Sequence, residues 1–444
     1  MKRKASQYLQ KWLGKPGRKP LVMRGARQVG KTWLVRELAR ESGRRLVELN
    51  FERRPELAAH FESNDPKVVL NTLSAEFGQT IDVNTALLFL DEIQAAPELL
   101  PKLRWFYEEI PELPVVAAGS LLEFVLGDHD FSMPVGRISY MHVEPMSFME
   151  FLGAVGEELL RGQLDGGTVP QPLHEKAGRL FREYCLVGGM PEVVADWAVF
   201  RSHESRREKQ ISLLATFRDD FNKYRNRVPD DVLRAVFGSV PAQLGERFMF
   251  SHVDREMRQP TVKKAFSLLT KARVCHRVSA VSHVGVPLSG DGEDGLFKAV
   301  FMDTGLALAS LGIGAADWLG GEADLWNKGP VAEQVVGQLL RCRFEPFEEP
   351  SLHYWTTTSG GNAEIDYLVQ HGSRVVPVEV KAGAAGAMKS LHHFMAKYRL
   401  EEAVRFDANP PSAQQVHVRT TTGDDADYTL RSFPLYMAER VFRS

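Results

Sequence analysis

Residues 25–32 read Gly25-Ala26-Arg27-Gln28-Val29-Gly30-Lys31-Thr32, which matches the phosphate-binding loop pattern G-x-x-x-x-G-K-[ST]. The apolar run Leu21 to Met23 precedes this octapeptide, and residues Trp33 to Ala39 follow it with helical periodicity. The motif requires this succession of a strand, a glycine-bounded loop and a helix. We therefore expect the loop amides and the helix N-terminus to bind phosphate groups. The alternative is a chance glycine-rich turn.

Several residues of this loop have chemical roles that follow from their type. Gly25 and Gly30 allow the backbone to approach a phosphate because they lack a Cβ. Lys31 is expected to reach the β- and γ-phosphates, and the Thr32 hydroxyl is expected to ligate Mg²⁺. The other positions of the loop, which would contribute backbone amides, are Ala26, Arg27, Gln28 and Val29. The loop thus predicts a nucleotide and Mg²⁺ as ligands.

A second motif, which is acidic, follows the continuous apolar run Ala86 to Leu90. Such a run is typical of a strand covered on both faces in a parallel sheet. The run ends in Asp91-Glu92, and ligands of open α/β sheets bind at the carboxyl ends of the strands. We expect Asp91 to hold Mg²⁺, directly or through water. Glu92 is expected to polarise the water that attacks the γ-phosphate. The alternative is an ordinary acidic turn after a core strand.

Two further polar residues are candidates for contact with the nucleotide. Ser120 follows the apolar strand Val115 to Ala118 and could sense the γ-phosphate, as in P-loop ATPases with an additional strand. A helix-capping hydroxyl is the equal alternative for Ser120. Arg137 could contact a phosphate in its own subunit or in a neighbouring one, because a planar guanidinium suits transition-state charge. A surface ion pair is the alternative for Arg137.

The composition sets bounds on the class of protein. A chain of 444 residues with 44% hydrophobic and 25% charged residues is an ordinary globular protein of about three domains. A net charge of -2 does not indicate a polyanion partner, so any contact with DNA or RNA must come from local basic patches. The three cysteines form no C-x-x-C pair, which fits a reducing cytoplasm. We expect no signal peptide and no membrane span.

These motifs together resemble the prokaryotic AAA-type ATPases that carry a C-terminal domain of unknown function. The resemblance is carried by residues 24–32, 90–94, 118–122, 136–137 and 144–152. Ala26 stands where the family often has Pro, and Met146 stands where it often has Leu, but neither departure touches a chemical group. The resemblance implies an ATP-binding module of the additional-strand type, followed by a nuclease-like tail.

The middle of the chain reads as helices followed by short strands. The stretches Asp231 to Phe237 and Thr261 to Ala272 are amphipathic, and Val274 to Val281 and Phe297 to Met302 are strand-like. This succession resembles a winged helix-turn-helix. Basic residues of this region that could contact phosphates are Lys263, Lys264, Lys271 and Arg273. The alternative is a module for protein docking or for packing, since winged helices also serve those purposes.

The tail contains a second constellation of charged residues. Glu379 and Lys381 share one face of an expected strand, and Asp366 on the partner strand can lie across from them. This arrangement looks like the PD-(D/E)XK phosphodiesterase site, in which Asp366 and Glu379 would hold Mg²⁺. Lys381 would orient the water or stabilise the developing charge. Glu333 matches the upstream acid of that family, whereas Ile365 replaces the proline. The alternative is a salt-bridged structural cluster without activity.

We therefore predict an α/β protein with four regions. They are a P-loop ATPase domain with a parallel sheet at residues 1–155, a helical lid or linker at 156–228, a winged-helix-like domain at 229–303, and a restriction-endonuclease-like domain at 304–444. The predicted function is Mg²⁺-dependent ATP hydrolysis coupled to the two C-terminal regions, with DNA or RNA as the target. The alternative is an ATP-dependent switch that binds a protein partner and has an inactive tail. A homo-oligomer is left open, and a P-loop kinase is disfavoured because Glu92 provides a water-activating acid.

Overall fold

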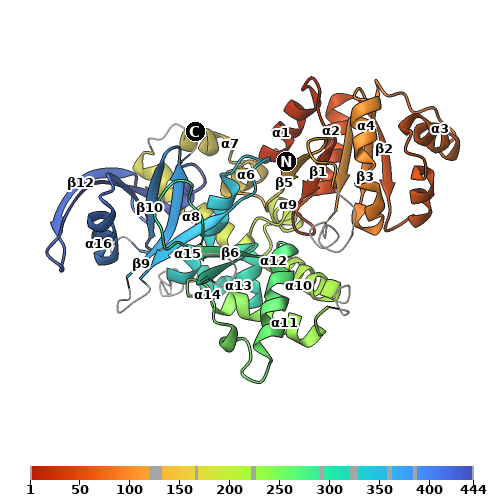
Figure 1. Cartoon of the computed structure of the whole chain (residues 1–444). Helices are drawn as coiled ribbons and strands as arrows, with labels where there is room; N and C mark the ends of the chain where they lie inside the picture. The colour runs from red at the N-terminus through yellow and green to blue at the C-terminus, as the bar shows by residue number, and fades with distance from the viewer. Residues whose placement is uncertain are drawn as a thin grey trace.

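The computed structural model describes residues 3–119, 133–165, 169–221, 227–290, 295–319, 329–357, 363–383 and 388–442. These residues build two sheets, one near each end of the chain, with helices packed around and between them (Figure 1). Ser120, for which we predict contact with the γ-phosphate, lies outside the described residues.

The N-terminal sheet is parallel and has the strand order β2-β3-β4-β1-β5. Its strands are β1 (Leu21–Arg24), β2 (Arg45–Asn50), β3 (Ala86–Asp91), β4 (Val115–Ala118) and β5 (Ser139–His142). The strand β4 lies between β1 and β3, which confirms the additional strand predicted from the sequence. This order sets the P-loop strand and the acidic strand on either side of one intervening strand.

Both faces of this sheet are covered, which explains why its strands are apolar throughout. Successive side chains of β1 enter different cores, since Leu21 and Met23 pack in one hydrophobic cluster and Val22 packs in the other. The elements around the sheet are α1 (Lys4–Leu13), α2 (Lys31–Ser42), η1 (Pro55–Phe61), α3 (Pro66–Glu76), η2 (Ile93–Ala95), η3 (Pro97–Leu99) and α4 (Leu103–Glu109).

Helices dominate the middle of the chain. They are α6 (Phe148–Ala154), α7 (Glu158–Asp165), α8 (Gln171–Val187), α9 (Pro191–Phe200), α10 (His203–Asp220), α11 (Asp230–Ala242), η5 (Phe250–His252) and α12 (Gln259–Lys271). The first of these begins with a capping box, in which Ser147 and Glu150 satisfy each other's backbone N–H groups. Within the described part of the chain, no helix is both long enough and apolar enough to cross a bilayer.

The C-terminal sheet is mixed and has the order β12-β13-β11-β10-β9-β8-β6-β7. Its strands are β6 (Cys275–Ala280), β7 (Phe297–Phe301), β8 (Leu352–Thr356), β9 (Glu364–His371), β10 (Arg374–Val380), β11 (Glu402–Asp407), β12 (Ser412–Arg419) and β13 (Asp425–Pro434). The helices of this part are α13 (Thr304–Ser310), α14 (Ala315–Leu319), α15 (Gly329–Cys342), α16 (Lys389–Tyr398) and η6 (Leu435–Met437).

The strands that the sequence assigns to a wing belong to this larger sheet. The strands β6 and β7 pair with each other in antiparallel fashion, and β6 also pairs in parallel with β8. The sheet therefore continues across residue 303, where we place a domain boundary from the sequence. One consequence is that side chains of β7 can reach the charged residues of the tail.

A glycine turn joins the helical region to the C-terminal region. The N–H of Gly189 donates to Asp303 Oδ2 at 2.6 Å, and Asp303 also caps α13 by accepting from the N–H of Leu306. A Cβ on Gly189 would lie 2.1 Å from the carbonyl oxygen of Met146, and one on Gly188 would lie 2.1 Å from Asp303 Oδ1. The two glycines are therefore structural, because no side chain fits where these segments meet.

We expect Gly189→Ala to destabilise the protein by about 1–3 kcal/mol or more, because the added methyl group collides with rigid backbone. The midpoint of urea unfolding measures this change. Gly162→Ala is the matched control, since Gly162 is exposed in α7 and has open space around it. A helical Ala there should be neutral or stabilise by about 0.5–1 kcal/mol. Equal midpoints for the two variants would contradict the close contact at Gly189.

Candidate functional site

The phosphate-binding loop connects β1 to α2 in a conformation that its glycines allow. Gly25 has φ 154° and Gly30 has φ 93°, and Gln28 also lies in the left-handed region at φ 62°. A Cβ on Gly25 would lie 2.4 Å from the carbonyl oxygen of Val143, which follows β5. The loop is therefore closely packed against the neighbouring chain segment, and Ala26 and Val29 are buried within it.

Lys31 and Arg3 hold the loop from two sides. The Lys31 Nζ donates to the carbonyl oxygens of Gly25 at 2.9 Å and Ala26 at 2.8 Å, and the side chain is buried. Arg3 donates from Nη1 to the carbonyl oxygen of Val29 at 3.2 Å. The ammonium of Lys31 thus lies inside the loop, where it can exchange carbonyl oxygens for phosphate oxygens.

Asp91 lies next to the loop at the carboxyl end of β3. The Thr32 hydroxyl donates to Asp91 Oδ2 at 3.3 Å, and Asn50 Nδ2 donates to the same oxygen at 3.2 Å. Burial and the nearby carboxylates of Glu92 and Glu48 raise the pKa of Asp91 to about 6. A hydroxyl and a carboxylate in contact, amid excess negative charge, fit the oxygen chemistry of Mg²⁺.

Glu92 turns the chain sharply after β3. Its backbone is left-handed at φ 50°, which is uncommon for a residue other than Gly, and its carboxylate accepts a hydrogen bond from Gln94 Nε2. The side chain is partly exposed, so water can reach it. Glu92 therefore stands at the same sheet edge as Lys31 and Asp91, as the sequence predicts for a general base.

The helix α10 reaches the loop through one ion pair. Arg27 Nη1 contacts Asp220 Oδ1 at the end of α10, and Arg27 Nη2 lies 4.0 Å from Glu52 Oε2. Glu92 is also close enough to act electrostatically on Arg27. A residue of the phosphate-binding loop is thereby connected to the helical region, almost two hundred residues along the chain.

Arg137 does not lie at this site within its own chain. It precedes β5, so it is at the edge of the parallel sheet opposite to the P-loop, which follows β1. Its Nε donates to Glu108 Oε1 at 2.8 Å in an exposed ion pair. The expected contact with a nucleotide in its own subunit is therefore wrong for this structure, whereas contact with a neighbouring subunit stays a prediction.

Sequence reasoning missed three residues of the nucleotide site, namely Arg3, Asn50 and Asp220 as an ion-pair partner. Asn50 was open to prediction, because it is a polar residue at the carboxyl end of a strand beside β3. Arg3 and Asp220 carry no such signal, since both reach the loop from distant segments.

The C-terminal region brings together the four charged residues predicted for a PD-(D/E)XK site. Glu333 is on α15, Asp366 is on β9, Glu379 is on β10, and Lys381 directly follows β10. Asp366 Oδ2 accepts from the N–H of Val380 at 2.7 Å, and Lys381 Nζ lies 2.5 Å from Glu379 Oε1. Strand pairing between β9 and β10 ends at Tyr367 and Val378, immediately beside Asp366 and Glu379.

A residue that the sequence did not indicate, Lys298 of β7, enters this cluster. Its Nζ lies 2.8 Å from Glu333 Oε2, 2.5 Å from Glu364 Oε1 and 3.9 Å from Asp366 Oδ1. Burial raises the pKa of Glu333, an effect that Asp366 reinforces and Lys298 opposes. Over the residues described, no group of three or more His, Cys, Asp or Glu is placed to hold a metal ion. The ammonium of Lys298 thus lies beside Glu333 and Asp366, two of the acids that the sequence assigns to Mg²⁺.

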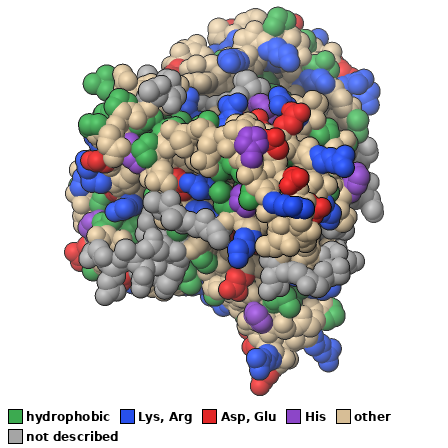
Figure 2. All heavy atoms as spheres, turned by 90° about the vertical axis from the view of Figure 1, so that its left-hand side faces the viewer, with side chains coloured by type: hydrophobic (Ala, Val, Ile, Leu, Met, Phe, Trp, Pro, Cys, Tyr) green, Lys and Arg blue, Asp and Glu red, His purple; other side chains and the backbone are tan. Residues whose placement is uncertain are grey.

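The basic residues of α12 are only partly available for contact with nucleic acid. Lys263, Lys264 and Lys271 are exposed. Arg273 is buried and donates from Nη2 to Glu349 Oε1 at 3.0 Å, so it is a packing residue. Figure 2 shows acidic and basic side chains mixed over the side of the molecule that carries the C-terminal sheet. The coloured side chains on this face therefore do not form a patch of one charge sign.

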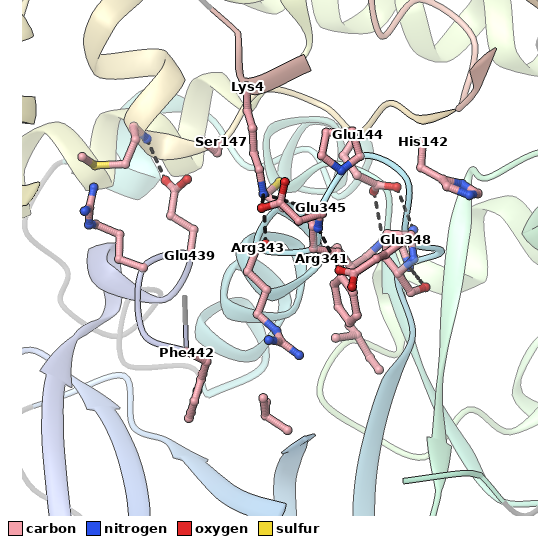
Figure 3. A pocket seen from close by; sticks show the side chains of 18 of the residues that line it. Lys4, His142, Glu144, Ser147, Arg341, Arg343, Glu345, Glu348, Glu439 and Phe442 are labelled. Carbon is pink, nitrogen blue, oxygen red and sulfur yellow. Dashed lines mark hydrogen bonds and ion pairs between the residues drawn. The ribbon is translucent and has the colours of Figure 1, made fainter. Parts of the chain in front are cut away.

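A cavity of about 660 Å³ lies between the N-terminal domain and the end of α15 (Figure 3). Arg341 donates from Nη2 and Nε to Glu144 at 2.8 and 3.0 Å, and Lys4 Nζ donates to the carbonyl oxygens of Arg343 and Phe344. Burial would raise the pKa of Glu144, but Arg341, His276 and Arg273 lower it to about 2. The two regions are thus joined by buried charge pairs.

Three family models match successive parts of the chain. An AAA domain matches residues 17–152, a domain of unknown function (DUF8612) matches residues 178–317, and a second domain of unknown function (DUF4143) matches residues 328–427. None of them spans half of the chain. Together with the sheet order, the first match supports a P-loop ATPase domain of the AAA type.

Solved structures show only distant likeness. ORC1 of Aeropyrum pernix in complex with DNA is 15% identical with a TM-score of 0.28, covering 71% of this chain and 92% of that one. The RuvB Holliday junction branch migration motor of Thermotoga maritima is 14% identical with a TM-score of 0.29, covering 62% and 88%. PCH-2 of C. elegans is 11% identical with a TM-score of 0.24, covering 38% of this chain and 48% of that one. These scores are too low to bear on function. The curated proteins include no significant match.

We expect Glu144→Gln to remove part of the acid sensitivity of the protein. The low pKa of Glu144 stabilises the fold above its unfolded pKa of about 4.3 by about 3 kcal/mol, and this contribution is lost as pH falls toward 2. Urea unfolding between pH 5 and pH 2 should show a shallower loss of stability in the variant. Glu345→Gln is the control, because Glu345 in the same cavity pairs with Lys4 but is half exposed. A slope equal to that of the parent would contradict the buried pair.

Proposed function

We propose that this protein binds ATP and hydrolyses it with Mg²⁺ as cofactor. The observation that supports this most directly is that Lys31 and Thr32 of the loop lie at one sheet edge with Asp91 and Glu92. A triphosphate bound by the loop amides would extend toward the two acids. The carboxylate of Glu92 is partly exposed, so it can take a proton from water. Hydrolysis therefore fits the site better than transfer of the phosphoryl group to an acceptor hydroxyl.

Each residue of the site would have a role that follows from its chemistry. Lys31 would exchange the carbonyl oxygens of Gly25 and Ala26 for the β- and γ-phosphates, and the loop amides would bind the remaining phosphate oxygens. Thr32 and Asp91 would hold Mg²⁺, which neutralises charge on the phosphates. Glu92 would orient the attacking water and accept its proton, while Gln94 keeps the carboxylate in position.

Nucleotide binding would reach the rest of the chain through Arg27. A triphosphate competes with Asp220 for the Arg27 guanidinium, so binding would release the end of α10. The helix α10 contacts α13, whose N-cap Asp303 accepts from Gln338 of α15. These contacts form a contiguous route from the loop to the helix that carries Glu333. Its role in coupling is a proposal that rests on packing.

We further propose that the C-terminal region contacts DNA or RNA. Support comes from the succession α15, β8, β9, β10, α16 and β11, with β11 parallel to β10, which gathers Glu333, Asp366, Glu379 and Lys381 as in PD-(D/E)XK proteins. The exposed lysines of α12 would add phosphate contacts. Fluorescence anisotropy with labelled single- and double-stranded oligonucleotides tests this. Absence of binding even at low salt, where phosphate contacts are strongest, would favour a protein partner instead.

We expect Glu92→Gln to bind ATP as the parent does and to lose turnover by at least about a hundredfold, because the amide cannot accept a proton from water. Single-turnover hydrolysis and a fluorescent-nucleotide titration measure the two effects. Lys31→Ala is the comparison, since it should lose ATP affinity itself. If Glu92→Gln turns over ATP at the parent rate, Glu92 is not the base.

We expect Asp220→Asn to tighten ATP binding about fivefold, because it removes a negative charge and frees Arg27 for the phosphates. The same nucleotide titration measures the change. Glu52→Gln serves as the control, since Glu52 lies at 4.0 Å from Arg27 and should have a smaller effect. Weaker ATP binding in Asp220→Asn would show that the ion pair supports the loop instead of competing with the ligand.

A further inference from the structure

We propose that Lys298 is the built-in cation of the C-terminal acidic cluster and occupies the position that a divalent metal would otherwise take. The C-terminal region would then bind its target without metal-dependent cleavage. The inference rests on the proposed function only in taking DNA or RNA as the target. It does not depend on ATP hydrolysis.

The contacts of Lys298 are those expected of a bound cation. Its ammonium has carboxylate oxygens of Glu333 and Glu364 at 2.8 and 2.5 Å and one of Asp366 at 3.9 Å. Glu333 and Asp366 are two of the three acids that the sequence assigns to Mg²⁺. A divalent metal and an ammonium both require these oxygens, and two cations cannot share them without strong repulsion.

One further oxygen of Asp366 and one of Glu379 also have partners. Asp366 Oδ2 accepts from the N–H of Val380, and Glu379 Oε1 pairs with Lys381. Among the described residues, the buried Oε2 of Glu379 has no hydrogen-bond partner. A metal at the cluster would therefore have to compete with Lys298, Lys381 and the Val380 N–H for carboxylate oxygens.

The backbone of Lys298 is paired on both sides and its side chain is enclosed. It pairs with Val278 of β6 on one side and bridges to Arg247 on the other. The side chain is only 3% exposed, and its Nζ lies 5.5 Å from the centre of the Tyr354 ring. Because the side chain is enclosed, movement of the ammonium away from the acids would require the neighbouring side chains to rearrange. Lys298 is therefore a structural residue of the cluster.

Direct measurement of metal binding tests this inference. The full-length protein without nucleotide is titrated with Mn²⁺, which binds the same oxygen ligands as Mg²⁺ and is followed by electron paramagnetic resonance. We expect the parent and Asp366→Asn to bind Mn²⁺ equally, because the parent has no site that depends on Asp366. A parent site that disappears in Asp366→Asn would overturn the proposal.

Lys298→Met provides the complementary test. Removal of the ammonium should create Mn²⁺ binding at least about tenfold tighter than in the parent, and the added change Asp366→Asn should abolish it. Circular dichroism establishes that the variant is folded, and Lys298→Gln replaces it if it is not. A folded variant without the gain would show that Lys298 is not what excludes the metal.

A control and an activity assay complete the experiment. Lys298→Arg keeps the charge and should resemble the parent in the Mn²⁺ titration. The parent should also leave supercoiled plasmid intact in Mg²⁺ or Mn²⁺, and nicking that requires Lys381 would overturn the proposal. Because nucleotide is absent throughout, failure here is distinct from a failure to hydrolyse ATP, which concerns only the P-loop site.

Discussion

The parallel sheet of the N-terminal domain imposes the constraint on which the nucleotide site depends. All of its strands end at one edge, so loops that are far apart in the chain meet there. The intervening strand β4 separates β1 from β3, and the Thr32 hydroxyl still reaches Asp91 because α2 starts directly at the loop. The same constraint sends Arg137 to the opposite edge, since it precedes its strand instead of following it.

The regions of the chain are joined by charged groups that are buried with their partners. Arg341 and Glu144 connect α15 to the segment after β5, and Lys298 connects β7 to the acids of the tail. Burial of one charge alone would be costly, so each partner holds the other's element in place. Such pairs do not add much to stability compared with apolar packing, but their geometry is specific. The Arg341–Glu144 pair thus links the two regions, and the contacts of Lys298 fix elements within the C-terminal region.

Local patterns were sufficient for the elements and for the residues of the P-loop. The continuous apolar runs at Leu21, Ala86 and Val115 predict buried parallel strands, because such strands are covered on both faces. The glycines of the loop and the acids after β3 follow from the chemistry of phosphate and Mg²⁺. The spacing of Glu379 and Lys381 likewise predicts that both point to one side at the end of β10, where they form an ion pair.

The sequence by itself therefore determined the strand, loop and helix of the P-loop, the acids beside it and the gathering of Glu333, Asp366 and Glu379. Only the tertiary structure decided that Asp220 pairs with Arg27 and that Lys298 enters the acidic cluster. The physical reason is that periodicity and turn chemistry act between near neighbours in the chain. An ion pair between distant segments instead depends on which elements the packing of the whole fold brings together.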